Sequence, residues 1–192
     1  MDRNQAWTLV SEYVQSDSLR RHMLSVEAAM RAYAPRFGGD ADVWGVTGLL
    51  HDFDYERFPD ISTGGHPVMG VNLLRERGVD EAILNAILAH AAEITGVQPS
   101  TPMEKTLVAV DELTGFLIAV ALVRPSRSIL DVELKSVKKK WKDKLFAAPV
   151  NREEIEHAAE ALGVPLDEHI QFVLDAMKAE ADALGLRGVP AS

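Results

Sequence analysis

The chain has 192 residues, with 20 basic and 29 acidic side chains, a formal charge of -9, six histidines and no cysteine. This length favours one domain, and 47% hydrophobic with 26% charged residues is typical of a globular protein rather than a disordered one. The lack of cysteine excludes disulfides, cysteine-ligated metals and thiol nucleophiles, so any metal must be held by His, Asp or Glu. The acidic total argues against non-specific nucleic-acid binding, and we expect no nucleic-acid partner.

Membrane and export signals are not evident in the sequence. Residues 1–17 contain no apolar core followed by a small-residue cleavage site, so no signal peptide is predicted. The longest uncharged apolar stretch, 113–123, has 11 residues, whereas a membrane span needs ~20. We therefore predict a cytoplasmic protein without a membrane partner.

Helical patterns begin at the N-terminus. Apolar residues recur at helical spacing over 6–14, which predicts a first helix. Ser18 is expected to cap a second helix, which carries His22 and ends near Pro35. Asp40 is expected to cap a third.

The third predicted helix ends in the doublet His51-Asp52, and a turn-rich stretch covers 54–65. Pro67 is expected at the first position of a fourth helix, where its missing N–H is not needed. Asp80 is expected to cap the fifth helix.

The second half of the chain continues the helical pattern. Residues 101–104 form a capping box with proline, which opens the most apolar helix, the one carrying Asp111. Asn151 is expected to cap a further helix, and a last one is predicted over 167–184. No long stretch alternates with a period of two, so we predict an all-α fold.

Six polar residues interrupt apolar faces or follow helices: His22, His51, Asp52, His66, His90 and Asp111. A buried carboxylate without a partner is costly, so Asp111 needs a cation or several hydrogen bonds. Neutral imidazoles and carboxylates together suit a hard or borderline divalent metal. Taken singly, each histidine is more often a hydrogen-bonded core residue, and Asp111 could be a salt-bridge partner. Taken jointly, the six favour one metal centre.

The order of these residues resembles the HD-domain superfamily of metal-dependent phosphohydrolases. Its defining pattern is a His on one helix, a His-Asp doublet on a later helix, and an Asp much further on. His22, His51-Asp52 and Asp111 match this pattern in order, and the resemblance covers 18–115. It implies a single helical bundle of the HD-domain type.

His66, within His66-Pro67-Val68-Met69-Gly70, and His90 resemble the two extra histidines of binuclear members, including the HDIG type. The resemblance implies one or two divalent ions, with Fe, Mn, Mg, Zn and Ni all open. One ion would be bound by His22, His51, Asp52 and Asp111, and a second by Asp52, His66 and His90. The Gly-Tyr-Pro signature of cyclic-di-GMP hydrolases is missing after this region.

The implied function is hydrolysis of a small phosphate ester or nucleotide by a metal-activated hydroxide, with Asp52 bridging the ions. Two alternatives remain open. A minority of HD-domain proteins with a similar ligand set use a di-iron centre to oxidise a substrate C–H bond with O₂. A non-catalytic module that binds a metal and a nucleotide is the other. The sequence leaves the substrate and the oligomeric state open.

Two further carboxylates are candidate general acids. Asp54 lies two residues beyond the doublet, and Glu93 lies three residues after His90. An exposed carboxylate without a catalytic role is the plainer interpretation of either residue, and it is the preferred one for Glu56. His157 and His169 lie among charged residues and are predicted to be at the surface.

Positive charge is concentrated over 124–144, where eight basic residues face three acidic ones, a net +5, so that the rest of the chain carries -14. A solvated basic face explains most of these lysines. Arg124, which offers bidentate geometry, and one of Lys135 or Lys138 are the candidates for contacts with a substrate phosphate.

The segments 111–116, 122–126 and 136–140 are similar to a bacterial subfamily known only as predicted HD hydrolases. That similarity names no substrate. We predict an HD domain with its N-terminal helix over 1–124, and a C-terminal helical extension over 125–192 that packs on the same core.

Overall fold

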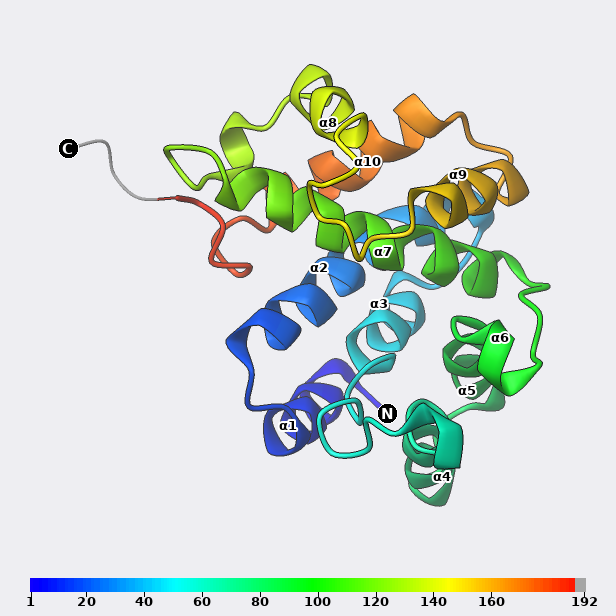
Figure 1. The fold of residues 1–192 in the computed structure, drawn as a ribbon. Coiled ribbons are helices and arrows are strands. Elements are labelled where there is room, and N and C mark those ends of the chain that lie inside the picture. Colours follow the sequence, from blue (N-terminus) through cyan, green and yellow to red (C-terminus); the bar gives the residue numbers. More distant parts are fainter. Residues whose placement is uncertain (189–192) are drawn as a thin grey trace. The chain divides into compact units, whose positions relative to one another are not determined.

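The computed structural model describes residues 1–188, which contain helices and no strand (Figure 1). The prediction of an all-α fold is therefore confirmed. The α-helices are α1 (Arg3–Tyr13), α2 (Asp17–Tyr33), α3 (Ala41–Leu50), α4 (Val68–Glu76), α5 (Glu81–Ala89), α6 (Ala92–Thr95), α7 (Pro102–Leu122), α8 (Leu134–Trp141), α9 (Arg152–Ala161) and α10 (Leu166–Ala179). Short 3₁₀-helices are η1 (Ala34–Phe37), η2 (Ile61–Thr63) and η3 (Ile129–Asp131). None of the helices in this described range is long and apolar enough to cross a bilayer.

The chain divides into two compact units, Met1–Val108 and the residues from Ala109 onward. The division falls inside α7, earlier than the predicted boundary near residue 124. That boundary, and the packing of the extension on the same core, stay predictions.

Helix α3 lies at the centre of the first unit, where it packs against α1, α2 and α5, while α4 packs against α5 (Figure 1). Every residue from Trp44 to Leu50 is buried. Gly48 allows the close approach of α2, because a Cβ at this position would lie 3.0 Å from the backbone nitrogen of Glu27. This tight packing fixes the end of α3 relative to α2.

Side-chain caps set the helix starts largely as the sequence predicts. Asp40 accepts hydrogen bonds from the N–H groups of Asp42 and Val43, and Asp80 accepts one from Ala82. The prediction for Ser18 is wrong, since Ser16 caps α2 by accepting from Leu19 N–H at 3.3 Å. Pro67 is the cap residue of α4 rather than its first helical residue, a shift of one position.

The second unit packs α10 against α8, α9 and η3. Asn151 caps α9 as predicted. The last helix ends at Ala179 rather than at residue 184, because the chain then tightens into turns such as Ala181 N–H to Lys178 C=O. His157 is exposed as predicted, but His169 is fully buried and donates from Nε2 to the carbonyl of Ala109 at 2.8 Å.

Candidate metal centre

Four histidines and one aspartate of the first unit come together from the ends of helices and from α2. His51 is the C-terminal cap residue of α3, and Asp52 follows it; His90 is the corresponding cap residue of α5. His66 lies just before α4, and His22 lies within α2. Residues far apart in the sequence thus converge because the buried faces of their helices pack together.

The carboxylate of Asp52 lies between two pairs of histidines. Its Oδ2 is 3.3 Å from His51 Nε2 and 3.7 Å from His22 Nε2. Its Oδ1 is 3.3 Å from His66 Nε2 and 3.6 Å from His90 Nε2. Each oxygen with its histidine pair forms a group of three potential metal ligands, and the two groups share Asp52.

Three of the imidazoles are held through Nδ1. His51 Nδ1 donates to the carbonyl of Gly48 at 2.8 Å, His90 Nδ1 donates to the carbonyl of Ile87, and His66 Nδ1 donates to Asp54 at 2.7 Å. A carbonyl or carboxylate oxygen accepts, so each Nδ1 carries a proton, and Nε2 is the ring nitrogen that faces Asp52 and that a metal would bind. Such contacts orient metal-binding histidines in proteins.

The Nε2 atoms meet at distances that fit a bound ion. His66 and His90 place theirs 3.3 Å apart, and His22 and His51 place theirs 3.2 Å apart. Each pair of nitrogens is close enough to share a proton in a hydrogen bond, and a bound ion would take the place of that proton. Two donors that each lie ~2.0–2.2 Å from one ion at an angle near 90–110° are ~2.8–3.6 Å apart. The donor set therefore fits a divalent metal at either group.

Asp52 is an anion at neutral pH. Burial acts to raise its pKa, but the charge and hydrogen bond of His51, with His90 and His22, hold that pKa well below its ordinary value. The side chains of Asp52 and His22 remain 17% and 19% exposed. The centre is thus open to water on one side.

Asp54 is buried, with both oxygens engaged. Oδ1 accepts from His66 Nδ1, and Oδ2 accepts from the N–H of Gly70 at 2.7 Å. Gly70 makes this approach possible, because a Cβ there would lie 2.5 Å from the carboxylate carbon of Asp54. Asp54 was predicted as a general acid, but this geometry is that of a residue that positions His66.

Two other predicted site residues lie elsewhere. Glu93 is exposed on α6, so its role as a general acid stays a prediction. Asp111 is half-buried on the part of α7 that belongs to the second unit, and its carbonyl accepts from the Thr114 hydroxyl at 2.9 Å. Its role as a metal ligand stays a prediction too.

The predicted phosphate-binding residues belong to the second unit. Lys135 pairs with Glu133 at 2.7 Å, and Lys138 pairs with Asp167 at 2.5 Å. Arg124 donates from Nη1 to Ser136 Oγ at 3.4 Å, and its buried Nε has no hydrogen-bond partner among the described residues. Arg124 is therefore the member of this group with a buried donor that has no partner among the described residues.

Sequence reasoning missed Gly70 and Tyr55. A glycine near the start of a predicted helix signals close packing, and this signal was present for Gly70. The rings of Tyr55 and His66 pack in a T-shaped arrangement, with centroids 5.3 Å apart and planes at 77°. Nothing in the local pattern around Tyr55 indicates this contact.

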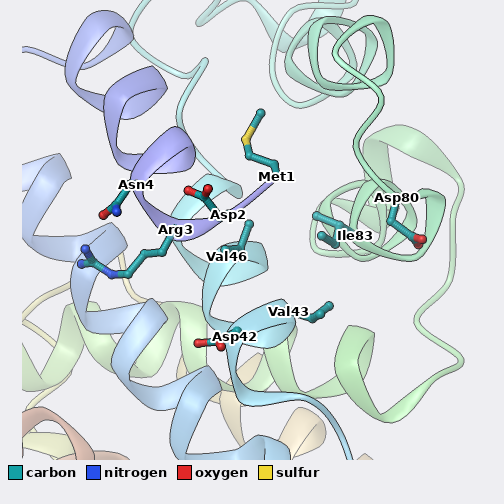
Figure 2. Close-up of a pocket in the computed structure, with 9 residues that line it drawn as sticks. All are labelled: Met1, Asp2, Arg3, Asn4, Asp42, Val43, Val46, Asp80 and Ile83. Atoms are coloured by element: carbon teal, nitrogen blue, oxygen red, sulfur yellow. The ribbon is translucent and has the colours of Figure 1, made fainter.

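A pocket of about 670 Å³ in the first unit lies away from these ligands (Figure 2). It opens at the N-terminal ends of α1, α3 and α5, whereas His51 and His90 lie at the opposite ends of α3 and α5. Two of its charged residues form ion pairs with residues outside the pocket: Arg3 pairs with Glu27, and Asp42 pairs with Arg31. We assign this pocket no role.

Comparison with known proteins agrees with the geometry. The family model of the HD domain matches residues 19–115, half of the chain. The chain therefore belongs to the HD-domain family, and that superfamily includes metal-dependent phosphohydrolases. The resemblance predicted from the order of the histidines and aspartates is confirmed.

Curated relatives extend well beyond the matched region. Ribonuclease Y 2 of Levilactobacillus brevis is 28% identical over 94 residues, which are 49% of this chain and 17% of that protein. Ribonuclease Y of Rhodopirellula baltica is 31% identical over 91 residues, 47% of this chain and 17% of that protein. The alignments thus span about a sixth of the relatives' length. No solved structure is a significant match.

Proposed function

We propose that this protein is a metal-dependent phosphohydrolase that cleaves a small phosphate ester. The observation that carries this proposal is the Asp52 carboxylate, with one oxygen toward His22 and His51 and the other toward His66 and His90. A shared carboxylate between two groups of ligands is the arrangement of two-ion sites in phosphatases and nucleases.

The residues of this chain would have separate roles in metal binding, positioning and proton transfer. His22, His51, Asp52 and Asp111 would hold one ion, and Asp52, His66 and His90 the other. Divalent ions at these positions supply Lewis acidity and acidify water. Asp54 keeps the proton of His66 on Nδ1, so that Nε2 remains a ligand. Glu93 remains our candidate proton donor to the leaving group.

Arg124 is the leading candidate for binding the phosphate. A buried guanidinium N–H without a partner costs about 1–3 kcal/mol, and a phosphate oxygen is the matching acceptor. Lys135 and Lys138 rank behind it, because each already forms a surface ion pair. The substrate that this proposal implies is a phosphorylated small molecule or a nucleotide.

The names of the relatives favour a second candidate, hydrolysis of a phosphodiester in RNA. The same two metal ions would serve either reaction, because negative charge develops on phosphate oxygens in both. The net charge of -9 favours the smaller substrate, since RNA binding draws on many basic contacts.

The proposal is tested by loading the protein with Mn²⁺, Fe²⁺, Zn²⁺ or Ni²⁺ and assaying phosphate release without oxygen. Substrates are a panel of phosphomonoesters and an RNA oligonucleotide. We expect release from monoesters, lost in Asp52→Asn and kept in His157→Ala, an exposed histidine of the second unit. Cleavage of the RNA oligonucleotide and of no phosphomonoester would identify RNA, rather than a small phosphate ester, as the substrate class. In a parallel aerobic assay of the iron-loaded protein, substrate-dependent oxygen uptake without phosphate release would establish the di-iron oxygenase. Tight ligand binding without turnover in either assay would establish the binding module.

A further inference from the structure

We propose that a groove beside the metal centre receives the leaving group of the substrate, and that this group is uncharged and aromatic. The inference rests on the proposed phosphohydrolase function and adds the class of leaving group. The groove has a volume of about 390 Å³. Its lining comes from the start of α2 and the segment after the His-Asp doublet: Ser16, Ser18, Leu19, His22, Tyr55 and Glu56.

The groove borders both groups of ligands. His22, one of its lining residues, belongs to the group on Oδ2 of Asp52. Tyr55, another lining residue, rests its ring against His66, which belongs to the group on Oδ1. An ester whose phosphate lies at the centre would therefore place its leaving group beside Tyr55.

Tyr55 offers an aromatic surface to this space. Its side chain is 45% exposed, although its backbone is fixed by a turn in which its N–H donates to the carbonyl of Asp52 at 3.0 Å. An exposed aromatic ring that contacts His66 on one side offers a surface on which another ring can stack. Leu19 adds an apolar contact to the same wall.

The charge of the residues that line the groove excludes a leaving group with a phosphate of its own. None of the six lining residues is lysine or arginine. The Glu56 carboxylate is held in the wall by the N–H groups of Gln15 at 2.6 Å and Ser16 at 2.8 Å. A leaving group with its own phosphate would meet this carboxylate without a compensating cation, so a monoester fits and a nucleoside triphosphate does not.

The first test measures binding without turnover. Benzylphosphonate and methylphosphonate differ by the ring, and neither is hydrolysed, so calorimetry of the metal-loaded protein gives both dissociation constants. We expect a 5- to 100-fold preference for benzylphosphonate, the range of one stacking contact. Tyr55→Ala should remove most of this preference, whereas Tyr55→Phe should keep it. Val43→Ala, which is exposed in the same unit but lies outside the groove, is the matched control.

The second test compares hydrolysis of benzyl phosphate and ethyl phosphate, whose leaving alcohols have similar acidity. We expect Tyr55→Ala to lower the benzyl-to-ethyl ratio of kcat/KM by 5- to 100-fold, mainly through KM. An unchanged ratio in Tyr55→Ala, or no preference for the ring in the wild type, overturns the groove assignment while phosphate release still upholds the hydrolase. Ring-dependent binding without hydrolysis of any ester overturns the hydrolase and leaves the groove assignment standing.

Discussion

The buried histidines of the two units use their ring nitrogens in opposite ways. In the first unit, His51 donates from Nδ1 to the Gly48 carbonyl and turns Nε2 toward Asp52. In the second unit, His169 is equally buried, but it donates from Nε2 to the Ala109 carbonyl. Burial and residue type are therefore the same for a candidate ligand and for a structural histidine. The two histidines differ in which ring nitrogen donates a hydrogen bond to a backbone carbonyl.

The charged residues of the two units differ in a similar way. In the first unit, the single carboxylate of Asp52 lies within 3.3–3.7 Å of the Nε2 atoms of four histidines. In the second unit, Lys135 and Lys138 each pair with one acidic partner on the surface. Exposed pairs of this kind contribute little because water screens them, whereas a buried cluster depends strongly on each member. Substitutions should therefore have large effects in the first unit and small ones in the second.

Asp52→Asn should have the largest effect. Asparagine has one acceptor oxygen and no charge, so neither pair of histidines keeps its anionic partner. We expect bound metal to fall from about two equivalents to a small fraction of one, and phosphate release to fall by at least about 100-fold. Elemental analysis and a phosphate assay measure these losses. Retention of both ions in Asp52→Asn would contradict the shared-carboxylate arrangement, and His169→Asn would control for the loss of a buried polar group.

Asp54→Asn and Gly70→Ala should weaken one ion position. The first removes the charge that orients His66, and the second places a Cβ against the Asp54 carboxylate. We expect affinity on the His66 side to fall by ~10–100-fold, with the His22 side less affected. Competition with a chelator separates the two affinities. If Asp54→Asn keeps both affinities and instead removes the alkaline limb of the pH–rate profile, Asp54 is the proton donor.

Glu104 should affect stability and its pH dependence. Burial acts to raise the pKa of Glu104. Hydrogen bonds from the N–H groups and side chains of Thr101 and Ser100 lower this pKa by more, so the net change is a decrease. A lowered folded pKa gives stability that is present above the unfolded value of about 4.3 and is lost as the pH falls through the folded value. Glu104→Ala should cost about 1 kcal/mol at pH 7.

Glu104→Gln keeps an acceptor at this cap, so it should retain most of the stability at pH 7 and lose less on acidification. Urea unfolding at pH 7 and at a series of values below 4.5 measures both effects. Equal acid sensitivity of the wild type and Glu104→Gln would show that another carboxylate controls this range.

Lys138→Ala should have the smallest effect. Its pair with Asp167 is about half exposed on both sides, so removing it should cost only about 0.2–1 kcal/mol of unfolding free energy. A double-mutant cycle with Asp167→Ala, repeated at high salt, measures the coupling. A large increase in KM for Lys138→Ala would instead assign Lys138 to substrate binding and reverse the contrast between the units.

The fold class and the metal-binding candidates were predictable because their signals are local or ordered along the chain. Helix caps such as Asp40 act over two or three residues, and the order of His22, the His51-Asp52 doublet, His66 and His90 indicated a shared centre. The errors at Ser18 and at the end of α10 are shifts in boundaries. At α2 two serines, Ser16 and Ser18, were both suitable caps, and at α10 the chain tightens into turns before the predicted end.

The amino-acid sequence by itself determined that the chain is helical and which histidines are candidate ligands, since periodicity, capping and residue order are properties of the chain. The tertiary structure decided which nitrogen each ring presents, that Asp54 supports His66, that His169 is buried, and that Tyr55 lines a groove. The Nδ1 atoms of His51 and His90 are held by carbonyls only three residues earlier, in the last turn of each helix. The roles of Asp54, Tyr55 and His169 depend instead on contacts between residues 11 to 60 positions apart, such as Asp54 with Gly70 and His169 with Ala109. Packing sets such contacts, and no local pattern records them.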